Sequence, residues 1–126
     1  EGTVRTMDRQ DRVLFEKRVR EIASNTARAY GADLEITWIA GAPAVYNDGK
    51  LAEKSMRIAK ECGFSVVPEE SSMGGDDFSL YEEKIPGCYI KIGTGKGPTI
   101  HQPNFQVDEK AIWPAAEYLV RLLMEN

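Results

Sequence analysis

The sequence contains a single histidine, His101, and only two cysteines, Cys62 and Cys88, in 126 residues. One histidine and two distant cysteines exclude the HExxH helix of zinc peptidases and every CxxC redox or zinc motif. The GxSxG element of serine hydrolases and the phosphate-binding loop that ends in GK[ST] are also absent. The chain therefore contains no complete catalytic motif of these classes.

Long hydrophobic runs are absent as well, and none approaches the roughly 20 apolar residues that a membrane span needs. Apolar residues at 42% and charged residues at 29% are typical of a globular domain. The net charge of −4 comes from interleaved acids and bases, so we expect neither a nucleic-acid nor a membrane partner. The apolar neighbours of Cys62 and Cys88 indicate buried free thiols, and with them a cytoplasmic protein.

The first forty residues predict a strand, a helix and a second strand. Residues 2–7 and 33–40 alternate as strands do, and a helix begins after Asp8 as its N-cap and stops at Gly31. The apolar positions that fall at helical spacing are Phe15, Val19, Ile22, Ala23, Thr26, Ala27 and Tyr30. Gly41-Ala42-Pro43-Ala44 then interrupts both periodicities and is the best candidate for a domain boundary.

The remainder alternates helices with short apolar strands, which is typical of a sheet covered by helices and predicts an α/β fold. The elements are a helix capped by Asn47 or Asp48 and ended by Gly63, a strand at 64–67, a loop at 69–77, a short helix capped by Asp76 or Asp77 and ended by Pro86-Gly87, a strand at 88–92, a loop at 93–105, and a helix capped by Asp108. The residues expected to face inward on the last helix are Ile112, Ala116, Leu119, Val120 and Leu123.

Two loops carry residues suited to chemistry. Gly74 and Gly75 precede paired aspartates at a helix start, where main-chain N–H groups can hold an anion or a developing oxyanion. A turn whose aspartates only cap the helix is the simpler interpretation. His101 lies in a loop stiffened by Pro103, which suits a metal ligand, although a single histidine is more often structural. Arg5, within the first predicted strand, is either a solvated residue or a bidentate partner for a substrate carboxylate.

Four stretches taken in order resemble the carboxy-terminal part of the metal-dependent aminoacylase and carboxypeptidase family, and especially amidohydrolases such as hippurate hydrolase and indole-acetyl-amino-acid hydrolase. The stretches are Gly2-Thr3-Val4-Arg5-Thr6, Tyr46-Asn47-Asp48, Met73-Gly74-Gly75-Asp76-Asp77-Phe78-Ser79, and His101-Gln102-Pro103 with Phe105. The chain departs from the family pattern at Asp76, where glutamate is usual, and at Gln102, where a second histidine is frequent.

The resemblance implies two domains. Residues 1–44 correspond to the carboxy-terminal half of a two-layer α+β lid that dimerises, and residues 45–126 to the end of a helix-covered catalytic sheet. The lid segment then lacks its usual partner strands, so its open strand edges favour self-association, and we expect a homodimer.

The resemblance also implies a function, namely hydrolysis of the amide bond of N-acyl amino acids or small peptides by metal-activated water. His101 then matches a ligand of two divalent metal ions, zinc or manganese, while Gly74, Gly75 and Asp77 line the substrate pocket and Arg5 grips the substrate carboxylate. The general base and the other ligands are expected upstream of residue 1, so the chain alone is expected to be inactive. The alternative is a small binding or interaction module without catalysis.

Overall fold

The structure is a computed structural model that describes residues 1–95, 97–98 and 100–125. The chain forms two compact units, of which the first comprises Glu1–Tyr46 and Glu70–Ile85. The second comprises Asn47–Glu69 and the chain from Pro86 onward. The first unit ends close to the predicted boundary but also includes residues 70–85. The assignment of residues 1–44 and 45–126 to a lid and a catalytic domain stays a prediction.

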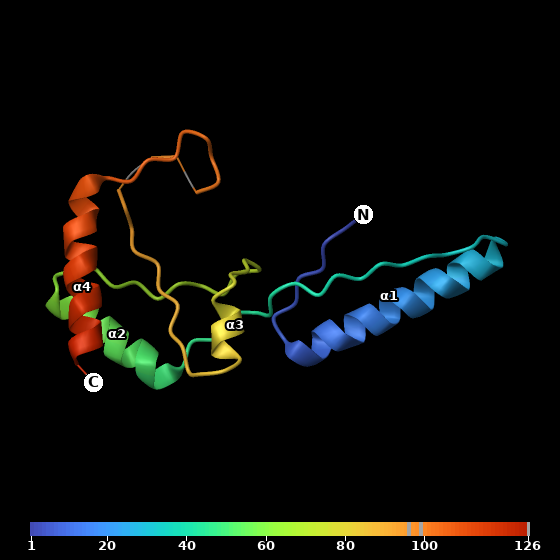
Figure 1. Ribbon diagram of the computed structural model, residues 1–126, viewed down its shortest axis with the longest axis horizontal. Coiled ribbons are helices and arrows are strands. Elements are labelled where there is room, and N and C mark those ends of the chain that lie inside the picture. Colours follow the sequence, from blue (N-terminus) through green and yellow to red (C-terminus); the bar gives the residue numbers. More distant parts are fainter. Residues whose placement is uncertain (96, 99, 126) are drawn as a thin grey trace. The chain divides into compact units, whose positions relative to one another are not determined.

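The helix α1 spans Arg9–Ala29 in the first unit (Figure 1). The Asp8 carboxylate caps it by accepting hydrogen bonds from the main-chain N–H of Gln10 at 2.6 Å and of Asp11 at 3.3 Å. Gly31 ends it with a φ of +64°, in the left-handed region that glycine adopts without steric cost. Both predicted ends of this helix are confirmed.

The apolar positions predicted for α1 contribute no buried residue to the first unit. Residues 33–42 run back along α1 in Figure 1, and Arg20 and Arg12 donate hydrogen bonds to the carbonyls of Ile36 and Ala42. This single extended segment covers only one side of the helix, so Phe15 and Ile22 remain exposed. Helical periodicity identified the element correctly, but a core needs a second layer on the apolar face.

The second unit is built on two helices, α2 at Gly49–Glu61 and α4 at Ile112–Met124, with a 3₁₀ turn, η1, at Glu109–Ala111. Asp48 caps α2, Asp108 caps η1, and Gly63 ends α2 with a φ of +85°. These signals are confirmed as well. No helix within the described ranges is both long enough and apolar enough to cross a membrane.

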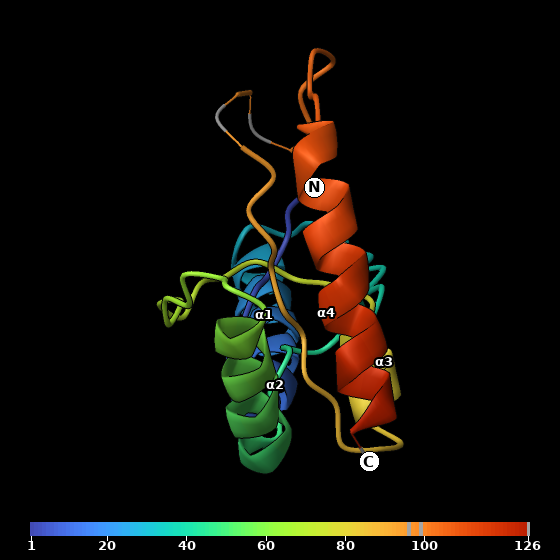
Figure 2. The ribbon, with the colours of Figure 1, turned by 90° about the vertical axis from the view of Figure 1, so that its left-hand side faces the viewer.

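The helices α2 and α4 lie side by side (Figure 2) and enclose a small core. Ile58 is completely buried and Tyr118 is 2% exposed. The Tyr118 hydroxyl shares a 2.6 Å hydrogen bond with the buried Ser55 hydroxyl, and its ring meets Phe64 edge-on at 5.9 Å between centroids. A buried hydroxyl pair that satisfies itself avoids the cost of an unmade hydrogen bond.

The inward face predicted for α4 is wrong. All five of its members, Ile112, Ala116, Leu119, Val120 and Leu123, are exposed, and Tyr118 instead faces α2. The helix is apolar over more than half its circumference, so periodicity does not determine which part meets α2. The aromatic ring of Tyr118 is selected because it fills the space beside Phe64 and its hydroxyl reaches Ser55.

The four predicted strands are also wrong for the described residues, in which no strand is formed. Residues 2–7, 33–40, 64–67 and 88–92 are irregular. A strand exists only through hydrogen bonds to a neighbouring strand, and alternation in sequence does not supply that neighbour. At Tyr89 a side chain takes this place, since Asn47 accepts from the Tyr89 N–H at 2.8 Å and donates to its carbonyl at 2.9 Å.

An ion pair joins α2 to the end of α4, with 2.6 Å between Arg57 Nη2 and Glu125 Oε2. The hydrogen bond from Arg57 lowers the pKa of Glu125 below its ordinary value of 4.5. A carboxylate with a lowered pKa stabilises the fold above its unfolded-state pKa, and this contribution disappears as the pH falls through the folded-state pKa. Both side chains are exposed, so the contribution is small.

Titration of Glu125 tests this contact. We expect its NMR titration midpoint to lie below 4.5 and to rise towards 4.5 in Arg57→Gln, because the principal hydrogen-bond donor is gone. Arg18→Gln is the matched control, since Arg18 pairs with Glu21 within α1. A midpoint that does not change in Arg57→Gln would contradict the ion pair.

Candidate functional site

The glycine-bearing loop lies in the first unit and is exposed from Ser71 to Gly75. Arg5 Nη1 donates a hydrogen bond to the Met73 carbonyl at 3.2 Å. A Cβ atom added at Gly75 would lie 3.3 Å from the same nitrogen. The structure therefore brings together Arg5, Gly74 and Gly75, three of the residues that the sequence proposed for substrate binding.

The two aspartates that follow the glycines have different positions. Asp76 precedes the short helix α3, Ser79–Glu82, and forms a turn in which its carboxylate accepts from the Phe78 N–H at 2.9 Å and its carbonyl accepts from the Ser79 hydroxyl at 2.8 Å. Asp77 is exposed, and its carbonyl accepts from the Leu80 N–H at 3.0 Å. The N-cap of α3 is Phe78, which makes no side-chain capping hydrogen bond, so the predicted cap at Asp76 or Asp77 is wrong. The Asp77 side chain is accessible to solvent.

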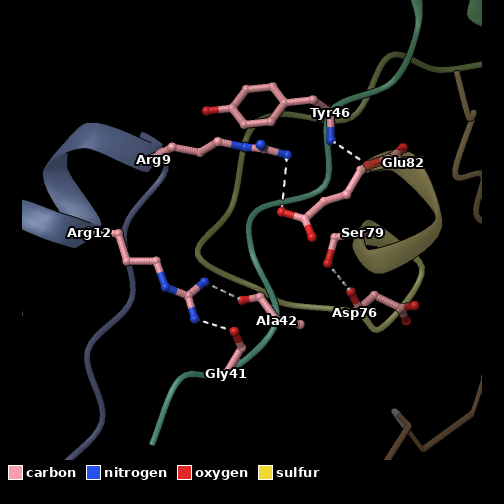
Figure 3. Close-up of polar contacts among 9 residues, drawn as sticks. Arg9, Arg12, Gly41, Ala42, Tyr46, Asp76, Ser79 and Glu82 are labelled. Carbon is pink, nitrogen blue, oxygen red and sulfur yellow. Dashed lines mark hydrogen bonds and ion pairs between the residues drawn. The ribbon is translucent and has the colours of Figure 1, made fainter. Parts of the chain in front are cut away.

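The helix α3 is tied to the start of α1 by charged and polar contacts (Figure 3). Arg9 Nη2 lies 3.3 Å from a Glu83 carboxylate oxygen, and the Tyr46 N–H donates to Glu82 at 2.8 Å. The Tyr46 hydroxyl donates to the Met7 carbonyl. These contacts hold Glu82 and Glu83 against the first turn of α1 and against Tyr46.

Arg12 makes a second contact at the start of α1 (Figure 3). Its guanidinium donates to the Ala42 carbonyl at 2.8 Å and also to the adjacent Gly41 carbonyl. Arg9 and Arg12 were not singled out from the sequence. The sequence nevertheless contained a hint, because two cations near a helix N-terminus interact unfavourably with the helix dipole. Arginines at such positions therefore suggest hydrogen-bond acceptors in another segment.

His101 lies in the second unit, on a loop whose base is closed by a 3.0 Å hydrogen bond from the Asp108 N–H to the Thr94 carbonyl. Its side chain is exposed and its φ is +68°, the only positive φ of a non-glycine residue in the described part of the chain. Such a conformation costs about 1–2 kcal/mol for a residue with a Cβ. Lys96 and Thr99, which the predicted loop at 93–105 includes, lie outside the described residues.

The donors that a metal ion would need are incomplete. Among residues 1–95, 97–98 and 100–125, no group of three or more histidine, cysteine, aspartate or glutamate side chains is placed to hold a metal. A metal site in a protein needs three or four ligands at one place. The exposed imidazole of His101 is chemically suited to one position of such a site.

Comparison with known proteins identifies the family. A sequence model of peptidase family M20/M25/M40 matches residues 3–125. Because the match covers almost the whole chain, the protein belongs to this class of peptidases, and specifically to the M20/M25/M40 family. The resemblance inferred from the four sequence stretches is thereby confirmed.

Individual relatives agree with this assignment. The chain is 38% identical over 122 residues to N-acetylcysteine deacetylase of Bacillus subtilis (strain 168), which is 97% of this chain and 32% of that protein. It is 32% identical over 124 residues to N-acetyldiaminopimelate deacetylase of Streptococcus sanguinis (strain SK36), 97% of this chain and 33% of that protein. The chain thus spans about a third of the length of these curated relatives.

A solved structure shares the fold. A dinuclear metal-binding peptidase of the M20 family from Bacillus subtilis superposes with a TM-score of 0.84 at 36% identity, over 93% of this chain and 33% of that one. The chain therefore has the fold of the corresponding part of an M20 peptidase, which is consistent with the predicted α/β class. The predicted sheet and the lid remain outside what this similarity establishes.

Proposed function

We propose that the chain is part of a metal-dependent amidohydrolase that cleaves the amide bond of N-acyl amino acids or small peptides. The observation that carries this proposal is the family match over residues 3–125, together with relatives named as deacetylases of N-acetylated amino acids. The structural relative is a dinuclear metal-binding peptidase, and this similarity supports a cofactor of two divalent ions. Zinc and manganese are the candidates.

Within the proposed enzyme each site residue has a role. His101 would supply one imidazole ligand to the ions, which when bound polarise the scissile carbonyl and activate water. The exposed main chain at Gly74 and Gly75, with the accessible Asp77 carboxylate, would line the substrate pocket. Arg5 carries a guanidinium suited to a substrate carboxylate, because both groups are planar and can pair through two hydrogen bonds.

The His101 backbone supports the ligand role independently of the comparisons. A left-handed conformation at a non-glycine residue is more frequent at functional sites, where the surrounding structure maintains it. The lack of a three-ligand cluster in the described ranges supports the further proposal that the isolated chain is inactive. As the lid of such an enzyme, residues 1–44 would also provide a dimer contact.

A graft tests this function directly. Residues 1–126 would replace the matched 32% of Bacillus subtilis N-acetylcysteine deacetylase. We expect the graft to hydrolyse N-acetylcysteine, EDTA to abolish that activity, and zinc or manganese to restore it. We expect no hydrolysis by the 126-residue chain alone. Turnover that survives EDTA would contradict the metal mechanism, and a folded graft that is inactive with both metals would favour the non-catalytic module.

A further inference from the structure

The loop that contains Gly74 and Gly75 has few contacts of its own to define its shape. Its exposed residues lie between Val67 and the half-buried Asp76, and within it the Gly74 N–H makes a long 3.4 Å contact with the Ser72 hydroxyl. Upstream, Glu69 forms an ion pair with Lys91. Within residues 71–75 of the described chain, the contact from a distant part of the sequence is that of Arg5, 68 residues away, whose Nη1 donates to the Met73 carbonyl. That carbonyl belongs to the peptide group that also contains the Gly74 nitrogen.

Space, and not backbone conformation, explains a glycine at position 75. The positive-φ glycines of the described chain are Gly31, Gly63 and Gly95, and Gly75 is not among them. A side chain at residue 75 would instead place its Cβ 3.3 Å from Arg5 Nη1, tighter than an ordinary van der Waals contact. Absence of a Cβ therefore lets the guanidinium lie against the loop and reach Met73.

The downstream end of the loop is fixed by other residues. A helix of four residues such as α3 is too short to be stable by itself. It is held by the contacts of Tyr46 with Glu82 and of Arg9 with Glu83 (Figure 3). These contacts begin at residue 82, so they do not determine the main chain at residues 73–75. Asp76, next to Gly75, is held by its hydrogen bonds with Phe78 and Ser79, and Arg5 contacts the other side of the glycine pair at Met73.

We infer that Arg5 is a positioning residue, which fixes the main chain of Gly74 and Gly75 through its hydrogen bond to the Met73 carbonyl. This inference depends on the proposed function only where it calls the loop substrate-binding. The guanidinium has five N–H donors, and one of them is used on Met73. Arg5 therefore acts on the substrate pocket through the loop, in addition to any direct contact with a carboxylate.

The experiment uses NMR on the 126-residue chain and needs neither metal nor substrate. We expect Arg5→Ala to lower the ¹⁵N order parameters of Gly74 and Gly75 by about 0.1–0.2, from values near those of ordered backbone. The ¹³C signal of the Met73 carbonyl should move upfield as its hydrogen bond is lost. Arg5→Lys, which keeps a donor on a flexible stem, should restore part of both effects. Arg18→Ala, which removes an arginine paired within α1, should change neither.

A pair of glycine substitutions provides a second, independent measurement. Gly75→Ala should displace the Arg5 guanidinium slightly and move the Met73 signal in the same direction as Arg5→Ala, by a smaller amount. Gly74→Ala meets only the rotatable Ser72 hydroxyl, also at 3.3 Å, and should leave the Met73 signal in place. Unchanged order parameters and an unchanged Met73 signal in Arg5→Ala would overturn the inference. An inactive graft combined with these NMR changes would reject the enzyme proposal and leave the positioning role of Arg5 intact.

Discussion

Replacing His101 with alanine in the graft should lower kcat/KM for N-acetylcysteine by about 10³-fold or more. In the proposed enzyme, loss of the His101 ligand would weaken the binding of the ions that polarise the scissile carbonyl, and such polarisation is worth several kcal/mol of transition-state stabilisation. At about 1.4 kcal/mol for each factor of ten, a loss of about 4 kcal/mol corresponds to 10³-fold. Steady-state kinetics with a titration of zinc or manganese measures the effect.

Two further substitutions separate metal ligation from the backbone conformation of His101. His101→Gly suits a φ of +68° better than alanine does, so it should leave the graft at least as stable as the parent while activity is lost to the same extent. Asn104→Ala, on the same loop, is the control and should retain most of the activity. Full activity in His101→Ala would remove His101 from the metal site.

Replacing Ile58 with alanine should destabilise the second unit by about 3 kcal/mol. Ile58 is completely buried between α2 and α4, and truncation of a buried isoleucine removes favourable transfer energy and leaves a cavity. Urea denaturation of the 126-residue chain, followed by helical circular dichroism, measures the free energy of unfolding. Because the core of this unit is small, this loss is a large fraction of the stability of an ordinary domain.

Val67→Ala is the matched control for Ile58→Ala. Val67 is 77% exposed, so the same kind of truncation should change the free energy of unfolding by less than about 0.5 kcal/mol. Equal effects of the two substitutions would show that the interface of α2 and α4 does not stabilise the chain. Ser55→Ala should have an intermediate effect, because it leaves the buried Tyr118 hydroxyl without its partner.

The ends of the helices could be predicted from the sequence because the signals are local. The carboxylates of Asp8 and Asp48 accept hydrogen bonds from N–H groups two or three residues away, and Gly31 and Gly63 adopt a positive φ that other residues avoid. The residues of the candidate site could be predicted from the sequence for a different reason. The family motifs around Gly74 and His101 are recognisable as short patterns, whatever the fold around them.

The tertiary structure determined which segments and side chains contact each other. Sequence alternation predicted strands, but pairing requires a neighbour, and Tyr89 is paired with the Asn47 side chain instead. The apolar circumference of α4 allowed several inward faces, and the fit of Tyr118 against Phe64 and Ser55 selected one.

Arg5 shows the same division between local and long-range information. The sequence presented it as a guanidinium in an extended segment, suited either to solvent or to a substrate carboxylate. Its contact with the Met73 carbonyl links residues 68 positions apart, and no local pattern encodes a contact of that range. The sequence by itself determined the helices, the caps of α1 and α2, and the family, because these depend on neighbouring residues and short motifs. Only the tertiary structure decided which faces are buried and which residue holds the glycine loop, because those outcomes depend on packing between distant segments.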